Sequence, residues 1–167
     1  MGSLLPQMIE EKDILDLAAR IAVQARIDGV ERSQMENLLA SVETSSDPKM
    51  SPYFVTLYAY SRVGRKEMGE KTAALIHEAM NKLYEAGCER EEVRKLLGLA
   101  KWVYESFEEK ELKEEKEGKE ELTKVLREII NDVLKRRKTD TRNLTFRDTL
   151  EIIRAFREKA SKLKSKG

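Results

Sequence analysis

Apolar side chains recur every three or four residues along most of this chain, and this spacing constrains the fold more than any other feature. The stretch Ile14–Ala25 shows the pattern, because a helix would place Leu17, Ala18 and Ile21 on the same face as the first and last residues of the stretch. Strands would need apolar residues at alternate positions, and no stretch shows that pattern convincingly. The sequence therefore predicts an all-α fold. The 167 residues suit one compact domain, a single-domain helical bundle of about six to seven helices over residues 1–167.

The expected helix boundaries come from glycine, proline and capping side chains. The seven segments with helical periodicity span roughly residues 10–28, 31–43, 52–64, 66–86, 89–107, 120–137 and 145–163. Gly29, Gly64 and Gly87 should each end a helix, Gly64 in the left-handed conformation. The other expected end signals are Ser51 as a cap before Pro52, and Thr145 paired with Asp148 in a capping box.

Four of the apolar stripes are expected to meet in one core, namely those of the first, third, fourth and seventh helices. Leu75 belongs to the stripe of the fourth helix. The stripe expected to be buried in the third helix consists of Phe54, Leu57, Tyr58 and Ser61.

Charged residues make up 38% of the chain, against about 25% in an average soluble protein. The 32 Lys and Arg nearly balance the 31 Asp and Glu, so any nucleic-acid site must be a local basic patch. Residues 108–121 depart from this balance, with eight Glu and four Lys. They form either a solvated helix with i,i+4 ion pairs or a charged connector, and we expect a frayed helix end plus a connector.

Several features indicate a cytoplasmic protein. The single cysteine, Cys88, excludes an internal disulfide framework and fits a reducing compartment. No apolar run approaches the roughly 18 residues that a membrane span needs, and no basic segment precedes the first apolar residues as in a signal peptide. The abundance of Lys, Glu and Arg is typical of thermophiles.

The sequence offers few residues for catalysis. His77 is the only histidine, and a Cys–His pair would have to join it to Cys88, eleven residues away. No His/Cys set has metal-ligand spacing, and no glycine-rich phosphate loop is present. The carboxylates stand at helix-surface spacing beside lysines. We therefore predict a protein that is not an enzyme and that uses no metal or cofactor.

Arg62, Arg65 and Lys66 surround Gly64, where one helix is expected to end and the next to begin. The free N–H groups at the start of the next helix, together with these cations, would suit a phosphate. The alternative is capping, because basic side chains favour the C-terminal end of a helix.

A second basic stretch lies farther along the chain. Residues 135–142 carry five basic residues, among them Arg136 and Arg137, against one acidic residue. Such a stretch could bind a phosphate backbone with an affinity that falls steeply as salt rises. The alternative is an ordinary solvated face.

Trp102 is out of phase with its helix. At about 100° per residue it lies opposite the apolar stripe that includes Val93, Leu97 and Tyr104. Its expected neighbours on that face are Glu91, Lys95, Gly98 and Glu109. A tryptophan on a polar face often marks a contact with another helix or chain, so we expect Trp102 at an interface formed on assembly. The alternative is that a neighbouring helix of the same chain covers it.

Three segments carry a family resemblance. ILDLAARIAVQARIDGVERSQMENLLASV (Ile14–Val42) combines an amphipathic helix with a short turn and a new helix start that contains Ser33 and Gln34. It resembles the opening of the small helical subunit of type III-A CRISPR effector complexes, whose second helix has a Thr-Thr-Ser-Gln-x-Arg-like start. LYAYSRVGRKE (Leu57–Glu67) is similar to the Leu-x-Tyr-x-x-Gly-Arg segment of that family, and Phe146–Lys162 resembles its closing helix.

The resemblance covers about Ile14–Leu83 and Phe146–Leu163, while residues 87–143 have no counterpart. It implies a non-catalytic all-α subunit that stacks beside backbone and large subunits and lines the guide RNA–target RNA duplex. Its phosphate contacts would not read sequence, and the two basic clusters named above would make them. The small subunit of type III-B complexes is a near competitor. The other class is a helical protein-interaction module without nucleic acid, such as a dimeric adaptor.

Overall fold

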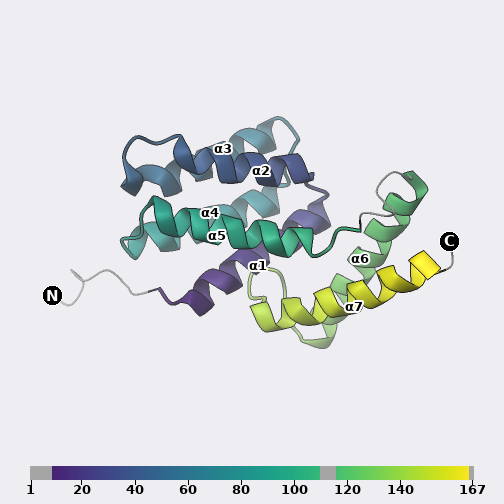
Figure 1. Ribbon diagram of the computed structural model, residues 1–167. Coiled ribbons are helices and arrows are strands. Elements are labelled where there is room, and N and C mark those ends of the chain that lie inside the picture. Colours follow the sequence, from purple (N-terminus) through teal and green to yellow (C-terminus); the bar gives the residue numbers. More distant parts are fainter. Residues whose placement is uncertain (1–8, 110–115, 166–167) are drawn as a thin grey trace.

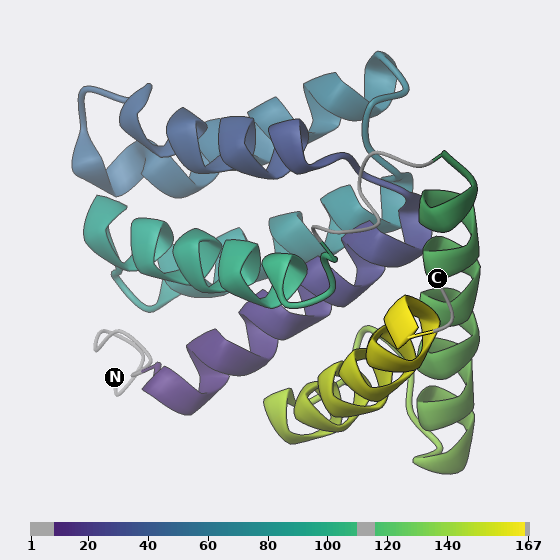
Figure 2. The ribbon, with the colours of Figure 1, turned by 45° about the vertical axis from the view of Figure 1, so that its right-hand side comes forward.

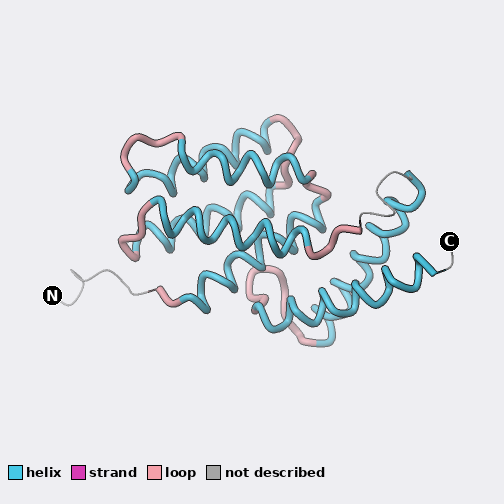
Figure 3. The backbone as a smooth tube through the Cα atoms, in the orientation of Figure 1, coloured by secondary structure: helices cyan, strands magenta, loops and turns pink. Residues whose placement is uncertain are grey.

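The computed structural model describes residues 9–109 and 116–165. Within them the chain forms seven α-helices, two short 3-10 helices and no strand, which confirms the predicted all-α bundle (Figure 3). The elements are α1 (Glu11–Asp28), α2 (Arg32–Ala40), η2 (Ser41–Glu43), η3 (Pro48–Met50), α3 (Ser51–Gly64), α4 (Glu70–Glu85), α5 (Arg90–Glu105), α6 (Lys116–Arg136) and α7 (Phe146–Ser165). Of the connector expected at 108–121, residues 110–115 lie outside the described part, and α6 has already begun at Lys116.

Helix α1 runs through the middle of the molecule (Figure 1). It packs most extensively against α5 and α4, and its other side meets the hairpin of α6 and α7. Figure 2 shows α2 and α3 as the layer farthest from α1, with α4 and α5 between. The predicted stripe of α1 is buried from Ile14 to Ala25, and Leu75 of α4 is buried too. Periodicity therefore placed these two helices correctly.

Side chains of α1 also cap three other helices. Asp28 accepts hydrogen bonds from the backbone N–H and the hydroxyl of Thr72 in the first turn of α4, at 3.3 and 2.6 Å. Asp16 accepts the N–H of the first residue of α7 at 2.7 Å. Arg26 donates to the carbonyl of Tyr104 near the end of α5 at 2.9 Å. Each charge has the sign that the helix dipole favours at that end, so α1 fixes the placement of all three helices.

Four helices end in the same two-bond motif. A left-handed residue one or two positions after the helix donates its N–H to the carbonyl three positions back, and the next N–H donates to the carbonyl five positions back. In α1 and α4 the left-handed residue is Gly29 (φ 73°) or Gly87 (φ 79°), as their expected stops suggested. In α3 and α6 it is Lys66 (φ 60°) or Lys138 (φ 52°). The prediction of a left-handed Gly64 is wrong, because that glycine is the last helical residue of α3.

Helix α3 buries a different face from the one predicted. Val55 and Ala59 are fully buried, whereas Phe54 and Leu57, expected in the core, are exposed by 39% and 70%. Helix α3 packs extensively on α4. Small side chains on the buried face of α3 allow a close approach to the elements it packs on, and the larger apolar side chains remain outside.

Of the two predicted N-terminal caps, one is wrong and one is confirmed. Met50 occupies the N-cap of α3, and the hydroxyl of Ser51 donates instead to the carbonyl of Val42 at 2.9 Å. At α7, the N–H of Asp148 donates to the Thr145 hydroxyl at 3.2 Å, and the N–H of Thr145 reaches the Asp148 carboxylate at 3.5 Å. That reciprocal pair is the predicted capping box.

Candidate nucleic-acid interface

Arg62, Arg65 and Lys66 come together in the turn between α3 and α4, at the top of the molecule in Figure 1. Nε of Arg65 lies 3.2 Å from the Glu67 carboxylate, and Nη1 of Arg62 lies 3.7 Å from it. The side chain of Lys66 is exposed and makes no ion pair with any residue that the structure describes. The turn thus carries three cations against one carboxylate, and only the Lys66 charge has no ion-pair partner among the described residues.

The phosphate site expected at the start of the next helix is already filled. Helix α4 begins at Glu70, four residues later than predicted, and the Asp28 carboxylate occupies its N-terminus. Gly69 makes room for that carboxylate, because a Cβ at this position would collide with the Asp28 side chain. The predicted phosphate site therefore already holds a carboxylate, which takes the N–H of Thr72 and would repel a second anion at this helix end.

Arg136 and Arg137 lie at the end of α6 and share one carboxylate. Arg136 lies 2.6 Å and Arg137 2.7 Å from the two oxygens of Glu151 in α7. Hydrogen bonds from Arg137 and then Arg136 lower the pKa of the Glu151 carboxyl. The hydrogen bond to Glu151 raises the pKa of the Arg137 guanidinium. These ion pairs link the end of α6 to α7, so an RNA phosphate would have to compete with Glu151 for both arginines.

Lys138 is a residue of this region that the sequence analysis did not single out as a site. It follows the two arginines, is left-handed, and makes no ion pair with the described residues. Arg62, Arg65 and Lys66 lie at the end of α3 and just after it, whereas Arg136 and Arg137 lie at the end of α6. The α6–α7 turn passes close to the start of α4, where Asp140, Thr141 and Arg142 line one pocket with Lys71, but no ion pair among the described residues joins the two basic clusters. Each turn instead presents one left-handed lysine without an ion-pair partner in the described part of the chain.

Trp102 lies on the outer face of α5 with 72% of its surface exposed. No other helix in the described part of the chain therefore covers Trp102, contrary to the alternative above. Glu109, expected beside it, is buried instead and lies 2.9 Å from Nη2 of Arg157. The reason is that α5 ends at Glu105, so Glu109 no longer follows the helical phase.

The described residues do not assemble a recognisable catalytic set. His77 is exposed, and its Nδ1 lies 3.0 Å from the hydroxyl of Tyr60. Burial raises the pKa of the Cys88 thiol, which is opposite to what a reactive cysteine needs. No group of three His, Cys, Asp or Glu side chains among the described residues could hold a metal ion.

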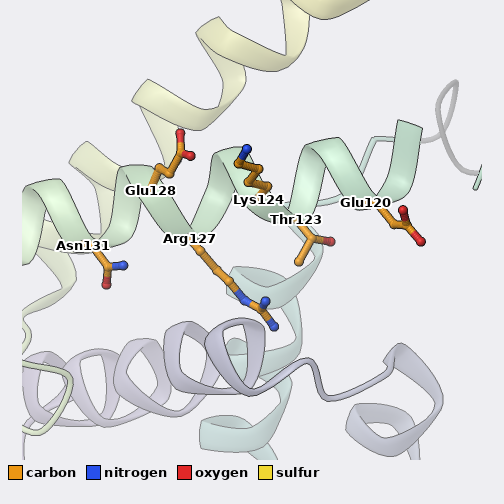
Figure 4. Close-up of a pocket in the computed structure, with 6 residues that line it drawn as sticks. All are labelled: Glu120, Thr123, Lys124, Arg127, Glu128 and Asn131. Atoms are coloured by element: carbon orange, nitrogen blue, oxygen red, sulfur yellow. The ribbon is translucent and has the colours of Figure 1, made fainter. Parts of the chain in front are cut away.

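A cavity of about 470 Å³ lies along α6 and is lined by side chains of both charge signs (Figure 4). Arg127 points from α6 toward α1, where its guanidinium lies 3.7 Å from the place of a Cβ at Gly29. Glu128 and Lys124 point the other way. These side chains therefore do not converge on one point within the cavity.

Comparison of the chain with protein-family models, with curated proteins and with solved structures found no match. Among the helices of the described part, none combines the length and the apolar character that a membrane crossing requires.

Proposed function

We propose that the protein is a non-catalytic RNA-binding subunit, similar to the small helical subunit of type III CRISPR effector complexes. Its partners would be guide RNA and target RNA together with backbone and large subunits, in the cytoplasm. The RNA contacts would be made to phosphates, without base readout, by the α3–α4 turn (Arg62, Arg65, Lys66) and the α6–α7 turn (Arg136, Arg137).

The observation that carries this proposal is the pair of left-handed lysines. Glycine is the residue that this backbone conformation favours, and a Cβ there costs about 1–2 kcal/mol. Lys66 and Lys138 bear that cost although neither charge pairs with a described residue. Backbone strain of this kind is typical of functional positions. An anionic ligand at both turns gives these charges a role that the fold itself does not.

The test is a salt titration of RNA affinity for the wild type and the triple variant Arg62→Ala, Arg65→Ala, Lys66→Ala. Removing one phosphate contact should reduce the slope of log K against log salt by about 0.7, and removing all three should reduce it by roughly 2. Binding should weaken most at low salt and should not depend on the RNA sequence. The fold should survive, because Arg65 and Lys66 are exposed in the turn and Arg62 lies in the last turn of α3, outside the buried core.

A matched control removes three charges elsewhere. Lys12, Lys124 and Lys159 are exposed, and none makes an ion pair with a described residue. The triple alanine variant of these lysines should keep the wild-type slope. If both triple variants change the slope equally, the effect is one of net charge, and the turn is not the binding site.

A protein-interaction module without nucleic acid is the second candidate, and the exposure of Trp102 favours it. A tryptophan exposed by 72% in a free monomer should emit at long wavelength and should be open to quenchers. If its fluorescence is instead blue-shifted and protected in dilute monomer, the chain covers it and the interface role is wrong.

A further inference from the structure

The outer face of α3 is an apolar ridge without a charged side chain. The α3 ridge comprises Tyr53, Phe54, Leu57 and Tyr60, whose spacing places them together on one side of the helix. Their exposed fractions are 43%, 39%, 70% and 43%, and Tyr84 of α4 adds a further exposed ring. In a chain with 38% charged residues, an exposed apolar face of this extent marks a contact surface.

Two of the ridge tyrosines are held in place by α4. The ring centroids of Tyr53 and Tyr84 lie 4.4 Å apart. Tyr60 packs against the edge of His77 at 5.7 Å between centroids, and its hydroxyl lies 3.0 Å from Nδ1. Rings that are already ordered lose little conformational entropy on binding, and tyrosine is frequent among the residues that dominate protein interfaces.

The charges around the α3 ridge decide which partner fits it. The only charged residue in α3 is Arg62, and its guanidinium is held 4.9 Å above the Tyr58 ring and 3.7 Å from Glu67. On the α4 side, Glu85 borders the ridge near Tyr53. Burial and the neighbouring Tyr84 raise the pKa of the Tyr53 hydroxyl, and the negative charge of Glu85 raises it further. The α4 flank of the ridge therefore carries a carboxylate beside Tyr53, while Arg65 and Lys66 lie beyond the C-terminal end of the ridge.

A nucleic acid is a poor match for this surface. Single strands bind where cations follow the backbone and aromatic faces receive the bases. Lys49, Arg65 and Lys66 lie beyond the two ends of the α3 ridge and do not follow it, and its most exposed residue, Leu57, has no aromatic face. An apolar helix surface with a carboxylate on its flank instead matches an amphipathic helix with basic side chains at its edge.

We infer that the α3 ridge docks an amphipathic helix of a partner protein, which turns an apolar stripe toward Leu57 and a Lys or Arg toward Glu85. Gly64 continues the same face of α3, and nothing lies within 4 Å of the place of a Cβ there. No contact within the described chain therefore requires glycine at this position, and its bare backbone leaves room for a close approach. This inference does not depend on RNA binding.

The test uses a fluorescent helical peptide of about 18 residues with leucines on one face and lysines on its flanks. A second peptide carries glutamates in place of the lysines. Anisotropy should show that the wild type binds the lysine peptide more tightly. Leu57→Ser should weaken that binding by about tenfold or more, as expected for the centre of an interface. Glu85→Lys should reverse the preference between the two peptides.

The matched control is Leu150→Ser, which makes the same change at an exposed leucine of α7 and should leave binding unchanged. The inference is overturned if the lysine peptide does not bind, or if both serine variants bind it alike. It is also overturned if Leu57→Ser abolishes affinity for a single-stranded RNA oligonucleotide while sparing the peptide. Concentration-dependent self-association that Leu57→Ser removes would assign the ridge to a second copy of this chain and likewise overturn it.

Discussion

Replacing Lys66 and Lys138 by glycine should make the protein more stable, although each change removes a side chain. A left-handed residue with a Cβ costs about 1–2 kcal/mol, and glycine relieves that cost. Glycine also makes the unfolded chain more flexible, which subtracts about 0.4–1 kcal/mol. The difference leaves up to about 1.6 kcal/mol of added stability per site, and about 0.8 kcal/mol from the middles of the two ranges. The two lysines lie in different turns and share no hydrogen-bond or ion-pair partner among the described residues, so the gains should add.

The assay is urea unfolding followed by circular dichroism at equilibrium. Thermal unfolding is a second readout: in a chain of this length each added kcal/mol of stability should raise the melting temperature by about 2–4 °C. Lys66→Ala and Lys138→Ala are the matched controls, because they remove the same charge but keep the Cβ, and they should bring no gain. If the glycine and alanine variants are equally stable at each site, the backbone is not strained there, and the argument from left-handed lysines fails.

Three further changes test the packing and the electrostatics. Gly69→Ala should lower the free energy of unfolding by about 1–2 kcal/mol, because the new Cβ displaces the Asp28 cap of α4; an equal decrease in an Asp28→Ala background would contradict this cause. Leu75→Ala should cost about 2–5 kcal/mol by denaturant titration, and a change of a few tenths would show that the side chain is not buried. The pKa of the Glu151 carboxyl lies below its ordinary 4.5, so its pairs stabilise the fold above that pH, and this stabilisation disappears as the pH falls. Stability curves of wild type and Glu151→Gln should therefore differ near neutral pH and approach each other as the pH falls below the ordinary glutamate pKa, whereas parallel curves would contradict the role of this carboxylate.

The helices were predicted well from the sequence wherever only one face of a helix is apolar. In such a helix the spacing of the apolar residues identifies the face that the fold buries. Helix α3 lacks that contrast. Its small residues Val55 and Ala59 face the core, and its large residues, Leu57 among them, face outward. Because both faces are apolar, periodicity could not choose between them, and the rule that large apolar residues are buried selected the wrong one.

The site was harder to predict because it depends on backbone conformation and on distant partners. Gly64 stands two positions before the left-handed residue, and sequence rules assign that conformation to glycine rather than to Lys66. The carboxylate at the start of α4 comes from Asp28, 44 residues earlier than its partner Thr72. Such a contact leaves no local sequence signal, and neither does the pairing of two arginines with Glu151.

The capping role of α1 has a consequence for how the chain folds during synthesis. The groups that α1 caps follow its capping residues by 44 residues in α4, by 78 in α5 and by 130 in α7. At about 5–20 residues per second, a ribosome needs roughly 6–26 s to make the last of these intervals. During that time the apolar face of α1 is covered first by α4 and α5, and only at the end by the hairpin. A ribosome that pauses within α6 would therefore carry a nascent chain in which α1 is only partly covered, a state that invites chaperone binding.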